Sequence, residues 1–219
     1  MILGIYGAGG LGRELFVLSH QINKKEHRWT DIIFIDDTKN ITMVHGIQPI
    51  PFVEAQSRYS STELEIVIAV GEPHTRSILR KKVQAAKFSL AILVHPSANI
   101  SDDTILGAGT VVCYNSFVSC DVTIGENVLL QPTVSIGHDS KIGEDSVIST
   151  YVCIAGGCEI GSETYIGLQV PVKEGVCIGN QSIIGMGSVV VRNIPDQVIA
   201  IGNPARVIKE NNELKVFKG

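Results

Sequence analysis

The sequence predicts a chain of two unlike parts, a small α/β domain with a parallel sheet followed by a parallel β-helix built from hexapeptides. Within residues 1–90, short apolar runs alternate with segments of helical spacing, which is typical of a parallel sheet with helices on its faces. From Val94 to Val190 an aliphatic residue instead occupies every sixth position, 17 times in succession without a slip. A period of six is the signature of a hexapeptide β-helix.

The first part is expected to contain four strands and two helices. The strands are placed on apolar runs. One helix is placed where apolar residues recur at helical spacing, and the other where a proline stands in a first turn. These criteria predict strands at 2–6, 31–35, 65–70 and 89–94, and helices at 13–22 and 72–86.

The second part is expected to wind as a triangular coil of three hexads, or 18 residues. Each aliphatic side chain would point inward and stack on its counterpart one coil away. The position four residues after each aliphatic residue is always small or β-branched, and glycine follows the aliphatic residue in eight hexads. Such residues fit the tight corners of a coil. A purely structural or ligand-binding β-helix protein is therefore one alternative for the function.

Composition and charge exclude several classes of protein. Hydrophobic residues make up 44% of the 219 residues and charged residues only 18%, so the chain is not expected to be disordered. A net charge of −4 gives no electrostatic footprint for nucleic acid. Five cysteines without a CxxC motif indicate a reduced, intracellular protein. No signal peptide or membrane-spanning run is apparent, so we expect a cytoplasmic protein without a membrane partner.

A glycine-rich motif marks a candidate phosphate site. Gly7-x-Gly9-x-x-Gly12 follows the first strand and opens a helix, so its backbone amides and the helix dipole could bind phosphate. Asp36, at the end of the second strand, would contact a ribose or base. The motif suggests an NAD-dependent oxidoreductase as one alternative, but four strands make only half of a dinucleotide fold. A mononucleotide-type ligand fits better, and a turn that serves packing alone is the remaining interpretation.

One histidine within the regular coil is a candidate general base. By the 18-residue stacking, His138 has Gly156 one coil above it and Cys120 one coil below. A neighbouring glycine would leave open space, as a substrate cleft needs. Asp139 could hold one tautomer of the imidazole and make it a stronger base. The alternative is an ordinary surface histidine. A zinc site of three coil histidines is rejected, because only His138 is well placed, and no metal is expected.

Taken together, the motifs of both parts resemble the NeuD/PglD-type family of bacterial sugar acetyltransferases. This resemblance covers nearly the whole chain. It rests on six motifs, which are Tyr6-Gly7-Ala8-Gly9-Gly10, Phe34-Ile35-Asp36-Asp37, Ile68-Ala69-Val70-Gly71, His95-Pro96-Ser97-Ala98, Gly137-His138-Asp139 and Gly202-Asn203-Pro204-Ala205.

The resemblance implies an architecture and an activity. It implies a Rossmann-like nucleotide-sugar-binding domain over 1–90, a left-handed β-helix that binds acetyl-CoA over 91–205, and a C-terminal tail over 206–219. The lysines and acidic residues of 209–218 predict a solvated helix or tail. It also implies a homotrimer with active sites between neighbouring β-helices. The expected reaction is acetyl-CoA-dependent N-acetylation of a UDP- or dTDP-linked amino sugar for surface glycan synthesis, with sialic acid-type O-acetylation as the alternative.

The resemblance further implies roles for single residues. His138 matches the catalytic base, and Asp139 the acidic neighbour that tunes it. Leu11 stands where some N-acetyltransferases of the family carry a histidine, whereas the O-acetyltransferase branch accepts an apolar residue there. The expected contacts with the nucleotide sugar are Gly9, Gly10, Leu11, Asp36, Asp37 and Gly71, and those with acetyl-CoA are Val147, Gly156 and Leu168.

Overall fold

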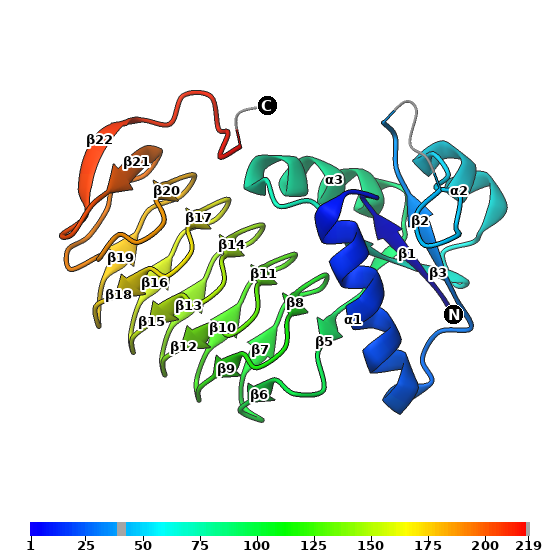
Figure 1. Ribbon diagram of the computed structural model, residues 1–219, viewed down its shortest axis with the longest axis horizontal. Coiled ribbons are helices and arrows are strands. Elements are labelled where there is room, and N and C mark those ends of the chain that lie inside the picture. Colours follow the sequence, from blue (N-terminus) through cyan, green and yellow to red (C-terminus); the bar gives the residue numbers. More distant parts are fainter. Residues whose placement is uncertain (39–42, 218–219) are drawn as a thin grey trace.

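The computed structural model describes residues 1–38 and 43–217. It consists of a small α/β domain before a β-solenoid of about six turns, which confirms the predicted fold class. Figure 1 shows the α/β domain at one end and to one side of the β-helix, with the C-terminal segment returning toward it. No helix among the described residues is long and apolar enough to cross a lipid bilayer.

The α/β domain is built on a four-stranded parallel sheet in the order β2-β1-β3-β4. Three of the four expected strands and both helices are present, α1 beginning three residues earlier than predicted, and α2 is an addition. The strand expected over 89–94 is instead divided, because Ser89–Leu90 pairs with β3 in this sheet whereas Leu93–Val94 pairs with Val111–Val112 of the β-helix. Gly12 explains the tight entry into α1, because a Cβ at this position would lie 1.9 Å from the carbonyl oxygen of Gly7. The elements are β1 (Ile2–Tyr6), α1 (Gly10–Glu26), β2 (Asp31–Ile35), α2 (Phe52–Arg58), β3 (Leu64–Ile68), α3 (Pro73–Ala85) and β4 (Ser89–Leu90).

Two-residue strands form the three faces of the β-helix. The first sheet contains β5 (Leu93–Val94), β8 (Val111–Val112), β11 (Leu129–Leu130), β14 (Val147–Ile148), β17 (Tyr165–Ile166), β20 (Ile183–Ile184), β21 (Val198–Ile201) and β22 (Arg206–Glu210). The second contains β6 (Asn99–Ile100), β9 (Phe117–Val118), β12 (Ser135–Ile136), β15 (Cys153–Ile154) and β18 (Pro171–Val172). The third contains β7 (Ile105–Leu106), β10 (Thr123–Ile124), β13 (Lys141–Ile142), β16 (Glu159–Ile160) and β19 (Cys177–Ile178).

The hexad pattern accounts for the core of the β-helix. Parallel pairs join residues 18 apart, as in Ile124 with Ile142 and Ile142 with Ile160, and the inward aliphatic residues form one continuous cluster. Each corner from Gly109 to Gly187 turns through a residue with positive φ. Glycine, asparagine and aspartate occupy many of these positions, because they tolerate that conformation better than most residues. Asn127 (φ 55°) and Asp139 (φ 59°) are two examples.

The far end of the β-helix departs from the repeat. Ile178 pairs with Ile194 and Ile183 with Ile199, so the last coil is two residues shorter than those before it. Arg206–Glu210 then forms β22, antiparallel to β21, where the sequence suggested a solvated helix or tail. Beyond β22 the chain runs back to the α/β domain (Figure 1). The Glu72 carboxylate accepts hydrogen bonds there from the backbone amide of Val216, at 2.9 and 3.0 Å.

The three corners of the β-helix have different neighbours. The α3 vertex (126–127, 144–145 and 162–163) contacts α3. The α1 vertex (114–115, 132–133 and 150–151) lies across a cavity from α1. The distal vertex (120–121, 138–139 and 156–157) joins the second and third sheets. The α/β domain packs on the outer surface of the first sheet through Leu93, Val111, Leu129 and Val147, so the distal vertex is the corner opposite that domain.

Candidate active site

The β1–α1 loop is shaped by Asp36. The Asp36 Oδ2 accepts a hydrogen bond of 2.7 Å from the backbone N–H of Ala8, and Oδ1 accepts one of 2.9 Å from the backbone N–H of Thr38. Gly9 stands at the N-cap of α1 without a side-chain capping bond, and the first turn has no acidic residue. The first amides of α1 are therefore left without a side-chain acceptor, as phosphate binding would require.

Asp37 serves a different purpose from Asp36. Its carboxylate accepts hydrogen bonds from the Phe52 backbone N–H (2.8 Å), the Lys82 ammonium (2.5 Å) and the Tyr6 hydroxyl. Burial alone would raise the pKa of Asp37, but these hydrogen bonds and the Lys82 charge outweigh it and lower the pKa. Burial and the Asp37 carboxylate in turn raise the pKa of Tyr6. Asp37 thus joins β1, α2 and α3 at the edge of the sheet.

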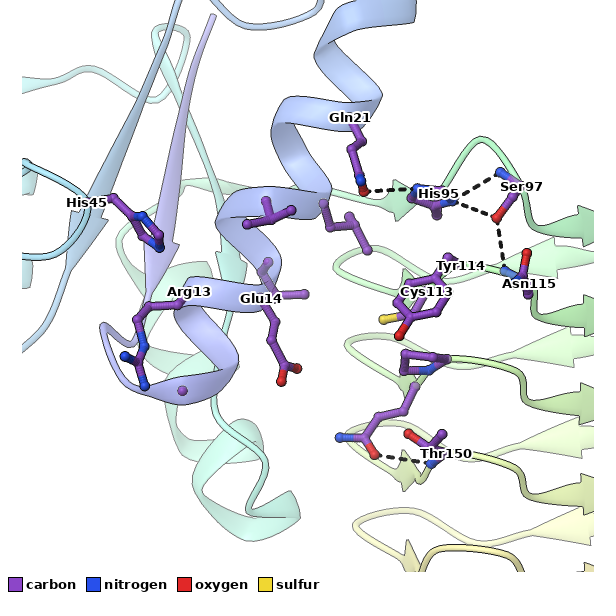
Figure 2. A pocket seen from close by; sticks show the side chains of 16 residues that line it. Arg13, Glu14, Gln21, His45, His95, Ser97, Cys113, Tyr114, Asn115 and Thr150 are labelled. Carbon is purple, nitrogen blue, oxygen red and sulfur yellow. Dashed lines mark hydrogen bonds between the residues drawn. The ribbon is translucent and has the colours of Figure 1, made fainter.

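Two hollows lie on either side of the β1–α1 loop. A cavity of about 350 Å³ is lined by Tyr6, Gly7, Asp36, Asp37, Thr38, Val70 and Leu79. A larger cavity of about 1100 Å³ begins at Gly10 and extends between α1 and the α1 vertex (Figure 2). Leu11 does not offer a free side chain to either hollow, because it packs against the apolar cluster that includes Val147. Gly71 lies close to the aromatic ring of Phe217, 3.5 Å from where a Cβ would stand.

The larger cavity has both polar and apolar walls. Figure 2 shows Arg13 and Glu14 of α1 on one side and Tyr114, Asn115 and Thr150 of the β-helix on the other. None of these five residues was predicted as a site residue. The three-to-four-residue spacing of α1 relates the residues of its one face, and the 18-residue stacking relates Tyr114, Pro132 and Thr150. Neither signal shows which surface the residues face.

His95 closes the upper end of this cavity and is held in one tautomer. Its Nδ1 accepts a hydrogen bond of 3.1 Å from the Ser97 backbone N–H, so the proton is on Nε2, which lies 3.0 Å from Oε1 of Gln21. Burial and the positive charge of Lys25 lower the pKa of His95. His95 therefore links α1 to the first coil, and neither ring nitrogen is free to act as a base.

His138 is arranged as a general base. Its Nδ1 lies 2.7 Å from Oδ2 of Asp139 and donates to this carboxylate, which leaves Nε2 as the free acceptor. Both side chains are well exposed on the distal vertex. The space beside Gly156 is not open, as the sequence suggested, but filled by the imidazole. A Cβ at Gly156 would lie 2.6 Å from Nε2, so glycine is needed to accommodate the ring.

A single chain does not bring all the predicted site residues together. Asp36, Asp37, Gly9 and Gly10 lie at or near the β1–α1 loop, whereas His138 is on the distal vertex. The residues expected to contact acetyl-CoA are also separated. Val147 is buried against the α/β domain, and Gly156 lies beneath the His138 ring. Leu168 is 44% exposed and lies one coil beyond Thr150, at the same corner of the β-helix as the α1 vertex.

Among the described residues, no group of three or more His, Cys, Asp and Glu could hold a metal ion.

A hexapeptide β-helix with an exposed histidine–aspartate pair, joined to a glycine-loop α/β domain, defines the class of hexapeptide-repeat transferases. Comparison with family models supports this class for both parts. Residues 3–83 match the PglD N-terminal domain, and residues 121–156 match the bacterial transferase hexapeptide (six repeats). The resemblance to the NeuD/PglD-type acetyltransferases is thereby confirmed. No curated protein sequence matches the chain.

Solved structures similar to the whole chain are acetyltransferases. PerB from Caulobacter crescentus, in complex with CoA and GDP-perosamine, has a TM-score of 0.87 at 28% identity, covering 95% of this chain and 97% of that one. The acetyltransferase domain of PglB from Neisseria gonorrhoeae, in complex with acetyl coenzyme A, has a TM-score of 0.88 at 28% identity, covering 94% and 98%. Variants of the Caulobacter enzyme with one histidine replaced by asparagine or alanine are similarly close, at 27% identity.

Proposed function

We propose that this protein transfers the acetyl group of acetyl-CoA to the amino group of a nucleotide-linked sugar. The observation that carries the proposal is the His138–Asp139 pair, whose free Nε2 lies over Gly156 on the β-helix. Support also comes from the similar structures, which include a perosamine N-acetyltransferase with CoA and GDP-perosamine. In two structures of that enzyme the same histidine is replaced, by asparagine in one and by alanine in the other, which is consistent with a role for this histidine in its reaction.

The proposed reaction is a direct transfer without an acyl-enzyme. The amine nitrogen attacks the thioester carbonyl carbon, and Nε2 of His138 removes the proton that the nitrogen loses. The new C–N bond forms as the C–S bond breaks, and the CoA sulfur leaves as a thiolate that takes up a proton. Asp139 stabilises the imidazolium that forms on His138, because its carboxylate accepts the Nδ1–H hydrogen bond throughout.

The acceptor and the acetyl donor are assigned to different parts of the protein. The diphosphate of the acceptor would bind at the β1–α1 loop, near Gly9 and Gly10, with its sugar in the 1100 Å³ cavity. Val147, Gly156 and Leu168 remain the residues proposed for acetyl-CoA. Because Val147 is buried against the α/β domain, its contribution would be to the shape of the first sheet rather than to direct contact.

The site is proposed to be completed by a second copy within a homotrimer. His138 lies at the corner opposite the α/β domain, so the base and the acceptor loop of one chain face different sides of the β-helix. A neighbouring copy would bring its distal vertex to the acceptor cavity. Several large apolar side chains are exposed at or beside the α1 vertex and its continuation along the same corner, as expected of an association surface. They are Tyr114, Phe117, Tyr151, Leu168 and Met186.

A thiol-release assay with acetyl-CoA tests the proposal. The acceptor panel should contain GDP-, UDP- and dTDP-linked amino sugars, the parent nucleotide sugars without the amine, and free sialic acid. Thiol release that requires an amino sugar supports N-acetylation, and release with sialic acid alone would indicate the O-acetyltransferase alternative. Absence of release with tight NAD binding would favour an oxidoreductase.

Since acetyl-CoA and nucleotide sugars are cytoplasmic metabolites, we place the reaction in the cytoplasm, in the synthesis of a surface glycan.

A further inference from the structure

A completely buried arginine connects the α/β domain to the β-helix. Arg76 of α3 is 0% exposed. Its Nη1 donates to the carbonyl oxygens of Ile68 (2.9 Å) and Val70 (3.0 Å), at the carboxyl end of β3. The other side of the same guanidinium donates to Asn127 on the α3 vertex, from Nε to the carbonyl oxygen (3.0 Å) and from Nη2 to Oδ1 (2.8 Å). One side chain thus binds both parts of the protein.

Asn127 extends this connection to the next coil. Its Nδ2 donates to Oδ1 of Asp145 (2.7 Å), one coil above, and to the carbonyl oxygen of Arg76 (3.2 Å). Asp145 is fully buried and accepts from Nε (3.0 Å) and Nη2 (2.7 Å) of Arg80, one turn further along α3. Nη1 of Arg80 also binds Glu126 at 3.0 Å. The four central residues, Arg76, Asn127, Asp145 and Arg80, are called the α3 clamp below.

The charges in the α3 clamp are well matched. Burial lowers the pKa of Arg76 to about 10, although the Asp145 carboxylate opposes the effect, so the guanidinium stays protonated at neutral pH. Burial also acts to lower the pKa of Arg80, but Asp145 and the neighbouring Glu144 and Glu126 outweigh it and raise the pKa. Buried charge networks add little net stability compared with apolar packing. Their directional bonds, however, allow only one relative placement of the groups that they join.

The carbonyl groups that Arg76 holds belong to the rim of the acceptor site. Ile68 and Val70 flank Ala69, and a Cβ at Gly7 would lie 2.6 Å from the Ala69 carbonyl oxygen, so this segment packs directly on the glycine loop. Gly71, a proposed acceptor contact, is the next residue of the chain after Val70. The Arg76 guanidinium therefore connects the β-helix directly to the rim of the acceptor site.

We propose that Arg76 and Asn127 are positioning residues, which fix segment 68–71 of the acceptor site against the β-helix that presents the acetyl donor. The inference rests on the proposed function. Because acetyl transfer needs the amine and the thioester carbon at near-contact distance, a small displacement of the acceptor loop relative to the β-helix would slow the chemical step. Loosening the α3 clamp should therefore affect the acceptor and the turnover rate, and leave acetyl-CoA binding unchanged.

Asn127→Gly tests this proposal without straining the backbone. Asn127 has a φ of 55°, which glycine adopts readily, and the substitution removes the side-chain bonds to Arg76 and Asp145. Gln181→Gly is the matched control, because Gln181 has a φ of 54° at the same position of its hexad, one coil above Glu163, and its side chain donates to Glu163 and not to Arg76 or Asp145. We expect Asn127→Gly to lower kcat/KM for the acceptor about ten-fold or more relative to the control, with an acetyl-CoA KM within about two-fold of wild type.

Hydrogen exchange supplies a readout that does not depend on activity. The amides of Val70 and Gly71 should exchange faster in Asn127→Gly than in Gln181→Gly, while the amides of the β-helix core exchange alike. Equal kinetics and equal exchange in the two variants would overturn the proposal. A loss shared equally by acceptor and acetyl-CoA, together with general destabilisation, would reduce the clamp to a structural role and also overturn it. Inactivity of the wild type with every acceptor would instead refute the proposed function, and the exchange comparison would still decide whether the clamp orders segment 68–71.

Discussion

Two neighbours orient the imidazole of His138, one in the chain and one in space. Asp139 accepts the hydrogen bond from Nδ1, and Gly156 provides room for the ring one coil away. The sequence was sufficient to bring these three residues together, because hexapeptide stacking relates positions 18 apart. The sequence could not show that the Asp37 carboxylate accepts hydrogen bonds from Tyr6 and Lys82, since those partners come from distant elements.

Replacement of His138 by alanine should remove the general base. We expect kcat to fall by roughly 10²–10⁴-fold, with little change in acetyl-CoA affinity, because the side chain is exposed and would contact only the reacting groups. Steady-state kinetics and calorimetry with acetyl-CoA measure the two effects. A variant within a few-fold of wild-type kcat would mean that the amine arrives deprotonated, and that the enzyme acts by positioning alone.

Gly156→Ala should impair the same base without altering its chemistry. The three atoms nearest to an added Cβ all belong to the His138 imidazole, at 2.6–3.1 Å, so the ring must turn away while the backbone stays in place. We expect a large fall in kcat with an almost unchanged Tm. In the double variant with His138→Ala, the alanine at 156 should cost nothing further, because there is no ring left to displace. Additive losses would show that Gly156 serves another purpose.

His95 should make the stability of the protein sensitive to mild acid. Its pKa is lowered in the folded protein by burial and Lys25, so the unfolded chain binds the proton more tightly. The contribution of His95 is then complete above its ordinary value of about 6.5 and is lost as the pH falls below it. Urea unfolding at pH 7.5 and 5.5 should show a smaller stability difference for His95→Asn than for wild type. Identical differences would contradict the assignment.

Among the elements, the short strands of the β-helix were predictable and the ends of the chain were not. Strand pairing follows from the 18-residue coil, which the aliphatic hexads set without reference to distant residues. The regular pattern ends at Val190, and the last coil shortens just beyond it. The five residues of β22 are all exposed, so no hydrophobic alternation marks the strand. Its position depends on pairing with β21, which the sequence pattern does not show.

The returning C-terminal segment should depend on Glu72. This side chain accepts hydrogen bonds from the backbone amides of Val216 and Phe217, at 2.9–3.2 Å. Glu72→Gln removes the charge and leaves one acceptor oxygen, so the segment should detach more often. Limited proteolysis followed by mass spectrometry should show faster cleavage after residue 211 than in wild type. Glu213→Gln, an exposed substitution in the same segment, is the control, and equal cleavage of the two variants would contradict the prediction.

Across the whole molecule, the relative placement of the two parts could not be read from the sequence. The hydrogen bonds that set it join residues far apart in the chain, 51 positions for Arg76 with Asn127 and 89 for His74 with Glu163. Neither hydrophobic periodicity nor motif spacing identifies such pairs. The consequence for function is considerable, because this placement puts the β1–α1 loop and His138 on different sides of the β-helix, which is why we propose a site shared with a second copy.

Two inactive variants provide a test of the shared site. His138→Ala lacks the base but keeps the acceptor loop. Gly10→Glu keeps the base but puts a carboxylate where the acceptor diphosphate would bind. This second substitution should be compatible with folding, because no atom lies within 4 Å of a Cβ at Gly10 and an acidic residue is favourable at the N-terminus of a helix. Each variant alone should be inactive, and light scattering should give about three times the 23.6 kDa chain mass for both.

Mixed trimers of the two variants should regain activity. If the acceptor loop of one copy works with His138 of its neighbour, every trimer that contains both variants has both halves intact in one site of about three. Co-expression with two affinity tags yields the mixed trimers, and the thiol-release assay measures their activity against wild type. If both halves of a site belonged to one chain, every site would contain a defect and no activity would return. Recovery near a third of wild-type activity therefore distinguishes a site between copies from a site within one copy.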